Sequence, residues 1–361
     1  VCILFSLLAL SAATTFKNSV VLTSADINLN VQTQVPGIYN SVYYRIYATH
    51  ASGFPDSYAQ KVYIQDTNNV NFTLSQLAQP LPSTGYILSE TNKMRAPLTI
   101  YDGNAANDRV PFTFYIVDWL MDTYPVASAQ MTTSKIDSQV GYEAAGVTVL
   151  SAEKSFTMYN FDIGSLSNVY FSSVGFDEYS SDYRFMHIGS SSQAKISFLT
   201  MYGPIVTLFN SNMVFSRFQF QFMKNTKYDY TLSPGATFAL LSPGYLSSYA
   251  SYKIPYATIP EAYNQAFTWG DSNWINADIQ VRNVNPSTLT LRFTSSGGDN
   301  RDYISTSDES LSHIQAFGNR LSLIVNQNGN TNLKFLYQIT GGSSLSFSLL
   351  AALLVAVFKF H

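Results

Sequence analysis

Short segments in which apolar and polar residues alternate recur through this chain and constrain its fold more than any other feature. Successive side chains of a β-strand point to opposite faces of a sheet, so alternation predicts strands with one buried face. The segments are rich in β-branched and aromatic residues and are separated by Gly, Pro, Asn and Ser. They are Ser41–Tyr47, Gln60–Gln65, Leu98–Tyr101, Pro111–Val117 and Val214–Phe222.

The last of these segments, Val214–Phe222, shows the pattern most clearly. Its phenylalanines at 218, 220 and 222 fall on one face of a strand, and the two glutamines between them fall on the other. Outside the two ends of the chain, only short helical turns are expected, at Thr73–Gln79 and Ile259–Ala266. The sequence therefore predicts an all-β fold.

The composition excludes several classes of protein. The 361 residues contain 20 Lys and Arg against 23 Asp and Glu, for a formal net charge of −3, and only 12% are charged. Soluble domains usually contain about 25% charged residues. The balance offers no basic stripe for nucleic acid, so we expect no nucleic-acid partner. With 25 Tyr and 25 Phe, a coiled coil or a disordered chain is equally disfavoured.

The N-terminal residues predict secretion. Val1–Ala13 is an uncharged apolar run that ends in small residues, which indicates a signal peptide cleaved before Thr14. The alternative is a buried N-terminal helix or strand. The chain's single cysteine, Cys2, lies within this run. Cleavage would leave no thiol, and therefore no disulfide, thiolate catalysis or cysteine-bound zinc.

The C-terminal residues predict a lipid anchor. The fourteen residues Leu345–Phe358 are apolar or small and would rise about 21 Å as a helix, against a hydrocarbon core of roughly 30 Å. An apolar tail after small residues is typical of a glycosylphosphatidylinositol (GPI) attachment signal, although the polar spacer is short and Lys359 lies near the end. A short membrane-inserted tail and a buried terminal element are the alternatives. The lipid attachment candidates are Gly341, Gly342 and Ser343.

Turn-rich and polar stretches divide the remaining chain into β regions without a long linker. We expect a first β-sandwich region at 14–125, a second β region at 126–230, a third at 231–340, and the hydrophobic tail at 341–361, after the signal peptide at 1–13. Each region is long enough to bury a core of its own.

The third region resembles a CUB domain. Ser242–Tyr245 with Tyr249 resembles the early segment of that family, and Leu289–Phe293, Asp302–Ile304 and Asn319–Tyr337 resemble later strands in the same order. Leu98–Gly103 in the first region is similar to a shorter CUB motif. The chain differs from most CUB domains because it lacks their disulfides. It looks most like the divergent CUB-like proteins of nematodes.

The resemblance implies two or three antiparallel β-sandwich modules of jelly-roll type in a secreted or surface-attached protein, with a role in innate defence against microbes. Some CUB domains hold calcium through acidic side chains. Asp302 matches one such position, and Asp299, Asp308 and Glu261 could accompany it. The alternative, which we favour, is that these acids belong to solvated turns and that no cofactor is bound.

The scarce residue types give little support for an enzyme. The four histidines, at positions 50, 187, 313 and 361, form no metal-protease motif, and no nucleophile elbow or phosphate loop occurs. Asp177, Glu178 and Asp182 could serve as glycosidase carboxylates, but a solvated loop explains them better. We therefore predict a protein that is not an enzyme.

Aromatic residues beside polar ones suggest where a ligand could bind. Tyr179 and Tyr183 flank the acidic cluster, and Trp269 and Trp274 flank a stretch expected to form a polar turn. Such rings could stack on sugars, or they could instead cover a sandwich core.

Asn71-Phe72-Thr73 is an N-glycosylation sequon without proline, and in a secreted chain it predicts a glycan on Asn71.

These observations predict an extracellular, membrane-anchored CUB-like binding protein whose partner is a surface glycan or protein. A structural or adhesive surface-coat protein is the first alternative, since many tyrosines and few charges favour self-association. A secreted glycoside hydrolase is the second.

Overall fold

The computed structural model describes a large part of the chain between residues 18 and 341. The residues described are 18–38, 42–79, 88, 93–120, 125–129, 134–136, 146–153, 155–162, 168–172, 175, 184–189, 196–210, 218–224, 229–232, 237–241, 264–282, 289–295, 298, 300–305, 309–327 and 334–341.

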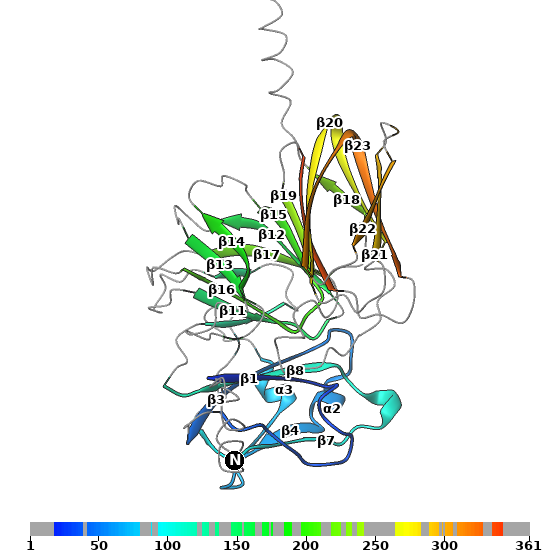
Figure 1. Ribbon diagram of the computed structural model, residues 1–361. Coiled ribbons are helices and arrows are strands. Elements are labelled where there is room, and N and C mark those ends of the chain that lie inside the picture. The colour runs from blue at the N-terminus through cyan, green and yellow to red at the C-terminus, as the bar shows by residue number, and fades with distance from the viewer. Residues whose placement is uncertain are drawn as a thin grey trace, which may run out of the picture.

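Strands dominate the described residues and confirm the prediction of an all-β fold (Figure 1). The helices among the described residues are single turns, α2 (Asp56–Ala59), α3 (Leu74–Leu77) and the 3-10 turn η1 (Ala106–Asp108). The turn α3 lies where one was expected. The expectation of a turn at Ile259–Ala266 is wrong for Asn264–Ala266, which begin a long strand paired with a distant one. Hydrogen bonding to that partner strand overrides the local preference.

Two four-stranded sheets are built from residues 19–118. Sheet 1 has the order β1-β8-β3-β6 and sheet 2 the order β2-β7-β4-β5, and every pairing within them is antiparallel. Sheet 1 consists of β1 (Ser19–Thr23), β8 (Phe112–Asp118), β3 (Tyr43–His50) and β6 (Met94–Arg95). Sheet 2 consists of β2 (Thr33–Gln34), β7 (Thr99–Asp102), β4 (Val62–Gln65) and β5 (Asn71–Thr73).

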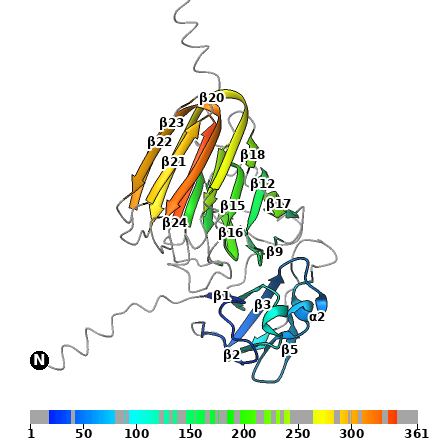
Figure 2. The ribbon, with the colours of Figure 1, turned by 90° about the vertical axis from the view of Figure 1, so that its right-hand side faces the viewer.

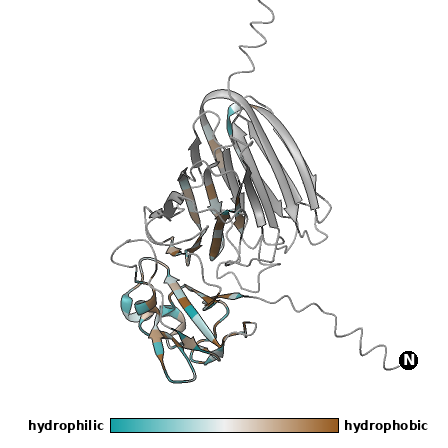
Figure 3. Ribbon diagram, turned by 90° about the vertical axis from the view of Figure 1, so that its left-hand side faces the viewer, coloured by the Kyte–Doolittle hydropathy of each residue, from teal (hydrophilic) through white to brown (hydrophobic). Residues whose placement is uncertain are grey.

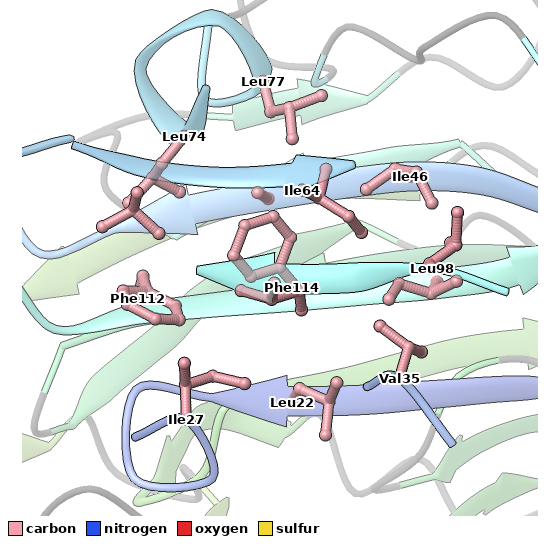
Figure 4. Packing of buried hydrophobic residues seen from close by; sticks show 14 of the residues in the cluster. Leu22, Ile27, Val35, Ile46, Ile64, Leu74, Leu77, Leu98, Phe112 and Phe114 are labelled. Atoms are coloured by element: carbon pink, nitrogen blue, oxygen red, sulfur yellow. The ribbon is translucent and has the colours of Figure 1, made fainter. Parts of the chain in front are cut away.

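A hydrophobic core fills the space between these two sheets (Figure 4). Sheet 1 contributes Ile46 and Phe114, sheet 2 contributes Ile64, and α3 contributes Leu74 and Leu77, all at most 2% exposed. Apolar residues alternate with polar ones along these strands, as the banding in Figure 3 shows. In sheet 2, buried residues alternate with half-buried ones along β4 and β7, so one apolar face meets sheet 1, whereas six successive residues of β8 in sheet 1 are buried.

A larger β structure is built from the rest of the described chain (Figure 2). Sheet 3 has the order β14-β13-β16-β11-β9. Its strands are β14 (Arg184–Gly189), β13 (Asn168–Ser172), β16 (Ile205–Asn210), β11 (Gly146–Leu150) and β9 (Val126–Ser128). All of its pairings are antiparallel except that of β9 with β11.

Sheet 4 has eleven strands in the order β10-β17-β12-β15-β19-β24-β20-β23-β21-β22, and β18 also pairs with β20. The strands are β10 (Ser134–Ile136), β17 (Phe218–Lys224), β12 (Phe156–Asp162), β15 (Ile196–Met201), β19 (Thr237–Leu241), β24 (Lys334–Gly341), β20 (Asn264–Arg282), β23 (Glu309–Gln327), β21 (Leu289–Ser295), β22 (Asn300–Ser305) and β18 (Asp229–Leu232). The parallel pairing of β15 with β19 joins strands before residue 224 to those after residue 237 in one sheet.

The outer face of sheet 1 packs against sheet 3, and we call this contact the seam. Its apolar part is a buried cluster from β1, β3 and β8 on one side and from β9, β11 and β16 on the other, joined by Leu88, which lies outside the named strands: Val21, Tyr47, Leu88, Tyr115, Val117, Val126, Leu150 and Ile205. Polar contacts lie beside it. Thr49 and Ser128 share a hydrogen bond of 2.6 Å, and the Thr113 hydroxyl donates to the Ser151 carbonyl at 2.7 Å. The seam therefore joins the two parts through both apolar packing and hydrogen bonds.

Candidate binding surface

The seam covers only part of the outer face of sheet 1. Along β3, every second residue belongs to this face, and Tyr47 and Thr49 are buried in the seam at 4% and 0% exposure. Towards the start of the strand, Arg45 is half-buried and Tyr43 is 42% exposed. The same face is thus closed at one end and open at the other.

Strand register gathers basic and aromatic residues at this open end. Tyr43 lies opposite Arg95 of β6, and Arg45 lies opposite Val117 of β8. Directly opposite residues of an antiparallel pair share a face. Trp119 continues β8, and its backbone N–H donates to the Tyr43 carbonyl at 3.1 Å. We call Tyr43, Arg45, Lys93, Arg95 and Trp119 the cation–aromatic cluster.

The cations of this cluster stack on its rings. The Arg45 guanidinium carbon lies 4.2 Å from the Trp119 ring centroid, and Lys93 Nζ lies 4.8 Å from the same centroid. Lys93 Nζ is also 5.5 Å from the Tyr43 ring centroid. These distances are within the range of cation–π attraction, worth about 0.5–1 kcal/mol at an exposed site. The attraction holds the charged ends of both side chains close to the rings.

Exposed apolar residues lie beside the cluster in sequence. Val42 is 52% exposed and Leu120 is 85% exposed. Lys93 and Arg95 are also exposed. Exposed apolar and aromatic side chains beside cations are typical of surfaces that bind a partner. This arrangement is the basis for treating the cluster as the candidate binding surface.

The neighbouring acidic residue Asp118 faces the other way. It lies opposite Tyr44, a residue of the core between sheets 1 and 2. Its Oδ1 accepts a hydrogen bond from the Leu120 backbone N–H at 2.8 Å. Burial raises the pKa of Tyr44; a hydrogen bond with the Ile38 backbone lowers it, and the charge of Asp118 raises it further. That influence agrees with the placement of Asp118 on the core side of the sheet.

A second polar cluster, at the η1 end of the sandwich, is structural. Asp102 is fully buried, and its Oδ2 accepts from Arg109 Nε at 2.9 Å. Its Oδ1 accepts from the backbone N–H of Asn104 at 3.1 Å and from Asn104 Nδ2 at 2.9 Å. Arg109 also donates to the Ile27 carbonyl. Because the carboxylate is enclosed by these donors, it holds the loop before β8 rather than facing a ligand.

The predicted glycosylation residue lies where a glycan could be accommodated. Asn71 is exposed and is the first residue of β5, the edge strand of sheet 2. Thr73 of the same sequon also caps α3: its Oγ1 accepts from the Gln76 backbone N–H at 3.3 Å. Gln76 Oε1 accepts from the Thr73 backbone N–H at 2.9 Å, which completes a capping box.

The two roles of Thr73 can be separated by substitution. Asn71→Gln is expected to remove only the glycan, whereas Thr73→Ala removes the glycan and also lowers the free energy of unfolding by about 1 kcal/mol through loss of the cap. Thr73→Ser keeps both and serves as the control. Mass spectrometry before and after glycosidase treatment and urea unfolding are the measurements. An unchanged mass of the wild type after glycosidase would contradict the glycan.

The predicted aromatic pair does not lie in a turn. Residues Trp269–Trp274 belong to β20, where Trp269 is paired with Leu232 and Trp274 with Phe317. The expectation of a polar turn between separate elements is therefore wrong, because the segment is part of β20 and both tryptophans are paired with residues of other strands. The polar residues between the indoles coincide instead with a register shift between Thr268 and Asn273. Tyr179 and Tyr183 lie outside the described residues.

The structure tests the calcium hypothesis only through backbone placement. Asp302 lies in β22, directly opposite Arg292 of β21. An opposite-charge pair across two strands is stabilising without a metal. Asp299, Asp308 and Glu261 lie outside the described residues, so calcium binding remains a prediction. Among the residues that are described, no three His, Cys, Asp or Glu form a group that could hold a metal ion.

The structure describes only some of the other residues that the sequence analysis singled out. Gly341 ends β24, opposite Ile275, while Gly342 and Ser343 lie outside the described residues. Asp177, Glu178 and Asp182 also lie outside the described residues. Within the described part of the chain, no helix reaches the length and apolarity needed to cross a bilayer.

Comparison with known proteins adds little. No family model matches the chain, and no curated protein matches it. Among solved structures, procruciferin, an 11S globulin from Brassica napus, is 10% identical, and the match covers 84% of this chain and 72% of that one. The TM-score is 0.14, so this similarity carries no argument about fold or function.

Proposed function

We propose that this chain is an extracellular recognition protein that binds its ligand through the cation–aromatic cluster without catalysing a reaction. It would display the cluster on antiparallel β-sandwich modules of CUB-like, jelly-roll type and be attached to a cell surface through its C-terminal end. The observation that supports the proposal is the stacking of Arg45 and Lys93 on Trp119 beside a Tyr43 that is 42% exposed.

The residue types of the cluster suit binding better than stability. Trp, Tyr and Arg are the side chains most enriched among residues that dominate binding energy at interfaces. Stability alone would favour burial of the Tyr43 ring, yet this ring lies at the open end of sheet 1. Because β3, β6 and β8 are paired strands, the cluster has a rigid support, as a preformed binding surface requires.

Replacing Trp119 with alanine tests this function directly. We expect secreted Trp119→Ala protein to bind cells at least about tenfold more weakly than wild type, as is usual for a dominant interface residue. Flow cytometry on bacterial, fungal and animal cells gives the measurement, and the microbial cells also test a role in defence.

The matched control is Tyr63→Ala. Tyr63 forms a tilted ring pair with Tyr101 of sheet 2, at 5.2 Å between centroids, and lies outside the cluster. We expect this variant to bind like wild type. Equal binding by the Trp119→Ala and wild-type proteins would contradict the proposed function, as would the absence of wild-type binding to all three kinds of cell.

A further inference from the structure

All the charged side chains of the cation–aromatic cluster are basic. Arg45, Lys93 and Arg95 are three of the 20 basic residues in a chain whose formal net charge is −3. Register places Arg45 and Arg95 on the outer face of sheet 1, and the ring contacts place Lys93 there too. A local excess of positive charge on an acidic chain attracts an anionic ligand.

Two described carboxylates near this corner accept hydrogen bonds from backbone N–H groups. Asp118 lies on the core side of β8 and accepts from a backbone N–H. Asp66 is 7% exposed; its Oδ1 accepts from the backbone N–H groups of Asn68 and Val70, and its Oδ2 accepts from that of Arg95 at 3.2 Å. Both acids are thus engaged with the backbone.

We infer that the ligand of the cluster is an acidic polysaccharide, a chain of sugars that bear sulfate or carboxylate groups. This inference rests on the proposed function. Guanidinium and ammonium groups donate charge-assisted hydrogen bonds to sulfate and carboxylate oxygens. The Tyr43 and Trp119 rings offer flat apolar surfaces to sugar faces.

The spacing of charges and rings favours a sugar chain over an acidic peptide. An acidic pyranose carries its apolar ring face and its anionic group on one small unit. The cluster holds its cations 4.2–5.5 Å from ring centroids, so both parts of such a unit have a partner nearby. A peptide carries its carboxylates on flexible stems, and ordering them costs conformational entropy.

Binding to purified polymers tests the inference. The purified protein is passed over immobilised heparin, which is sulfated, polygalacturonate, which is carboxylated, and uncharged dextran. We expect binding to at least one acidic polymer and none to dextran, with an affinity that falls as salt is added. The Arg45→Ala/Lys93→Ala variant is expected to bind at least tenfold more weakly. Lys93→Ala/Arg95→Ala, which changes only exposed side chains, provides a second test if the first variant folds poorly.

The charge-matched control is Lys61→Ala. Lys61 is exposed, and its Nζ lies 5.8 Å from the Tyr58 ring centroid, outside the cluster. We expect less than a twofold change for this variant. Equal binding by wild type and both double variants would overturn the inference, as would equally tight binding to polyglutamate or to phosphatidylserine vesicles. If wild type binds neither acidic polysaccharide while cell binding still requires Trp119, the inference fails and the proposed function stands.

Discussion

Replacing Arg109 with methionine is expected to lower the free energy of unfolding by about 3 kcal/mol, at the low end of the cost of breaking a buried ion pair. The Asp102 carboxylate is 0% exposed and would lose its only charged partner among the described residues. Its remaining hydrogen bonds, from the backbone N–H and Nδ2 of Asn104, offset part of the loss. Urea unfolding followed by circular dichroism measures the change.

A second substitution identifies the buried charge as the cause. In an Asp102→Asn/Arg109→Met protein the side chain at 102 is neutral, so we expect this double variant to be more stable than Arg109→Met alone. Arg95→Met, at an exposed position, is the control and should change stability by less than about 0.5 kcal/mol. A double variant less stable than Arg109→Met would show that shape and hydrogen bonding at Asp102 matter more than its charge.

Replacing Gly175 with alanine is expected to lower the free energy of unfolding by about 2–3 kcal/mol, because the seam has no room for a methyl group. A Cβ at this position would lie 2.2 Å from Tyr115 Cε2 and 2.5 Å from Tyr115 Oη. The Tyr115 ring is 2% exposed and stacks on Tyr47 at 6.1 Å between centroids, so it cannot move aside cheaply. Thermal unfolding of the purified protein measures the effect.

Two further proteins separate the clash from a general effect of alanine. At Gly203 an added Cβ meets nothing within 4 Å, so Gly203→Ala should be nearly neutral. In a Tyr115→Leu background the ring is absent, and Gly175→Ala should then cost much less. An equal cost of Gly175→Ala with and without the Tyr115 ring would contradict this account of the seam.

The sequence predicted strands well where β-branched and aromatic residues are dense. The expected strand Pro111–Val117 corresponds to β8, Phe112–Asp118, and each of its two ends differs by one residue because hydrogen bonding to β1 and β3 decides where the strand starts and stops. The segment Trp269–Trp274 shows the opposite case. Its Gly, Asp, Ser and Asn residues favour a turn locally, but Trp269 and Trp274 are paired with other strands, and the residues between them form a register shift inside β20.

The cation–aromatic cluster could not be predicted from the sequence. Tyr43 and Arg95 are far apart in the chain and become neighbours only through the register of β3 with β6. Trp119 follows a predicted strand, yet only its hydrogen bond to the Tyr43 carbonyl places it in the same corner. Alternation indicates which residues share a face of one strand, whereas the partners of that strand are set by long-range pairing.

The seam also couples the cation–aromatic cluster mechanically to sheet 3. Strands β3 and β8 carry the open end of the sheet 1 face, where the cation–aromatic cluster lies. A few residues away from that end, the same two strands carry the side chains that pack against sheet 3. The Ser52 backbone N–H donates to Glu153 Oε1 at 2.7 Å, and this bond, like that between Thr49 and Ser128, opposes a swivel of one part on the other. A force applied to a ligand at the cation–aromatic cluster is therefore transmitted as shear through these strands. The two parts of the protein would move together as one rigid body instead of as two domains joined by a flexible linker.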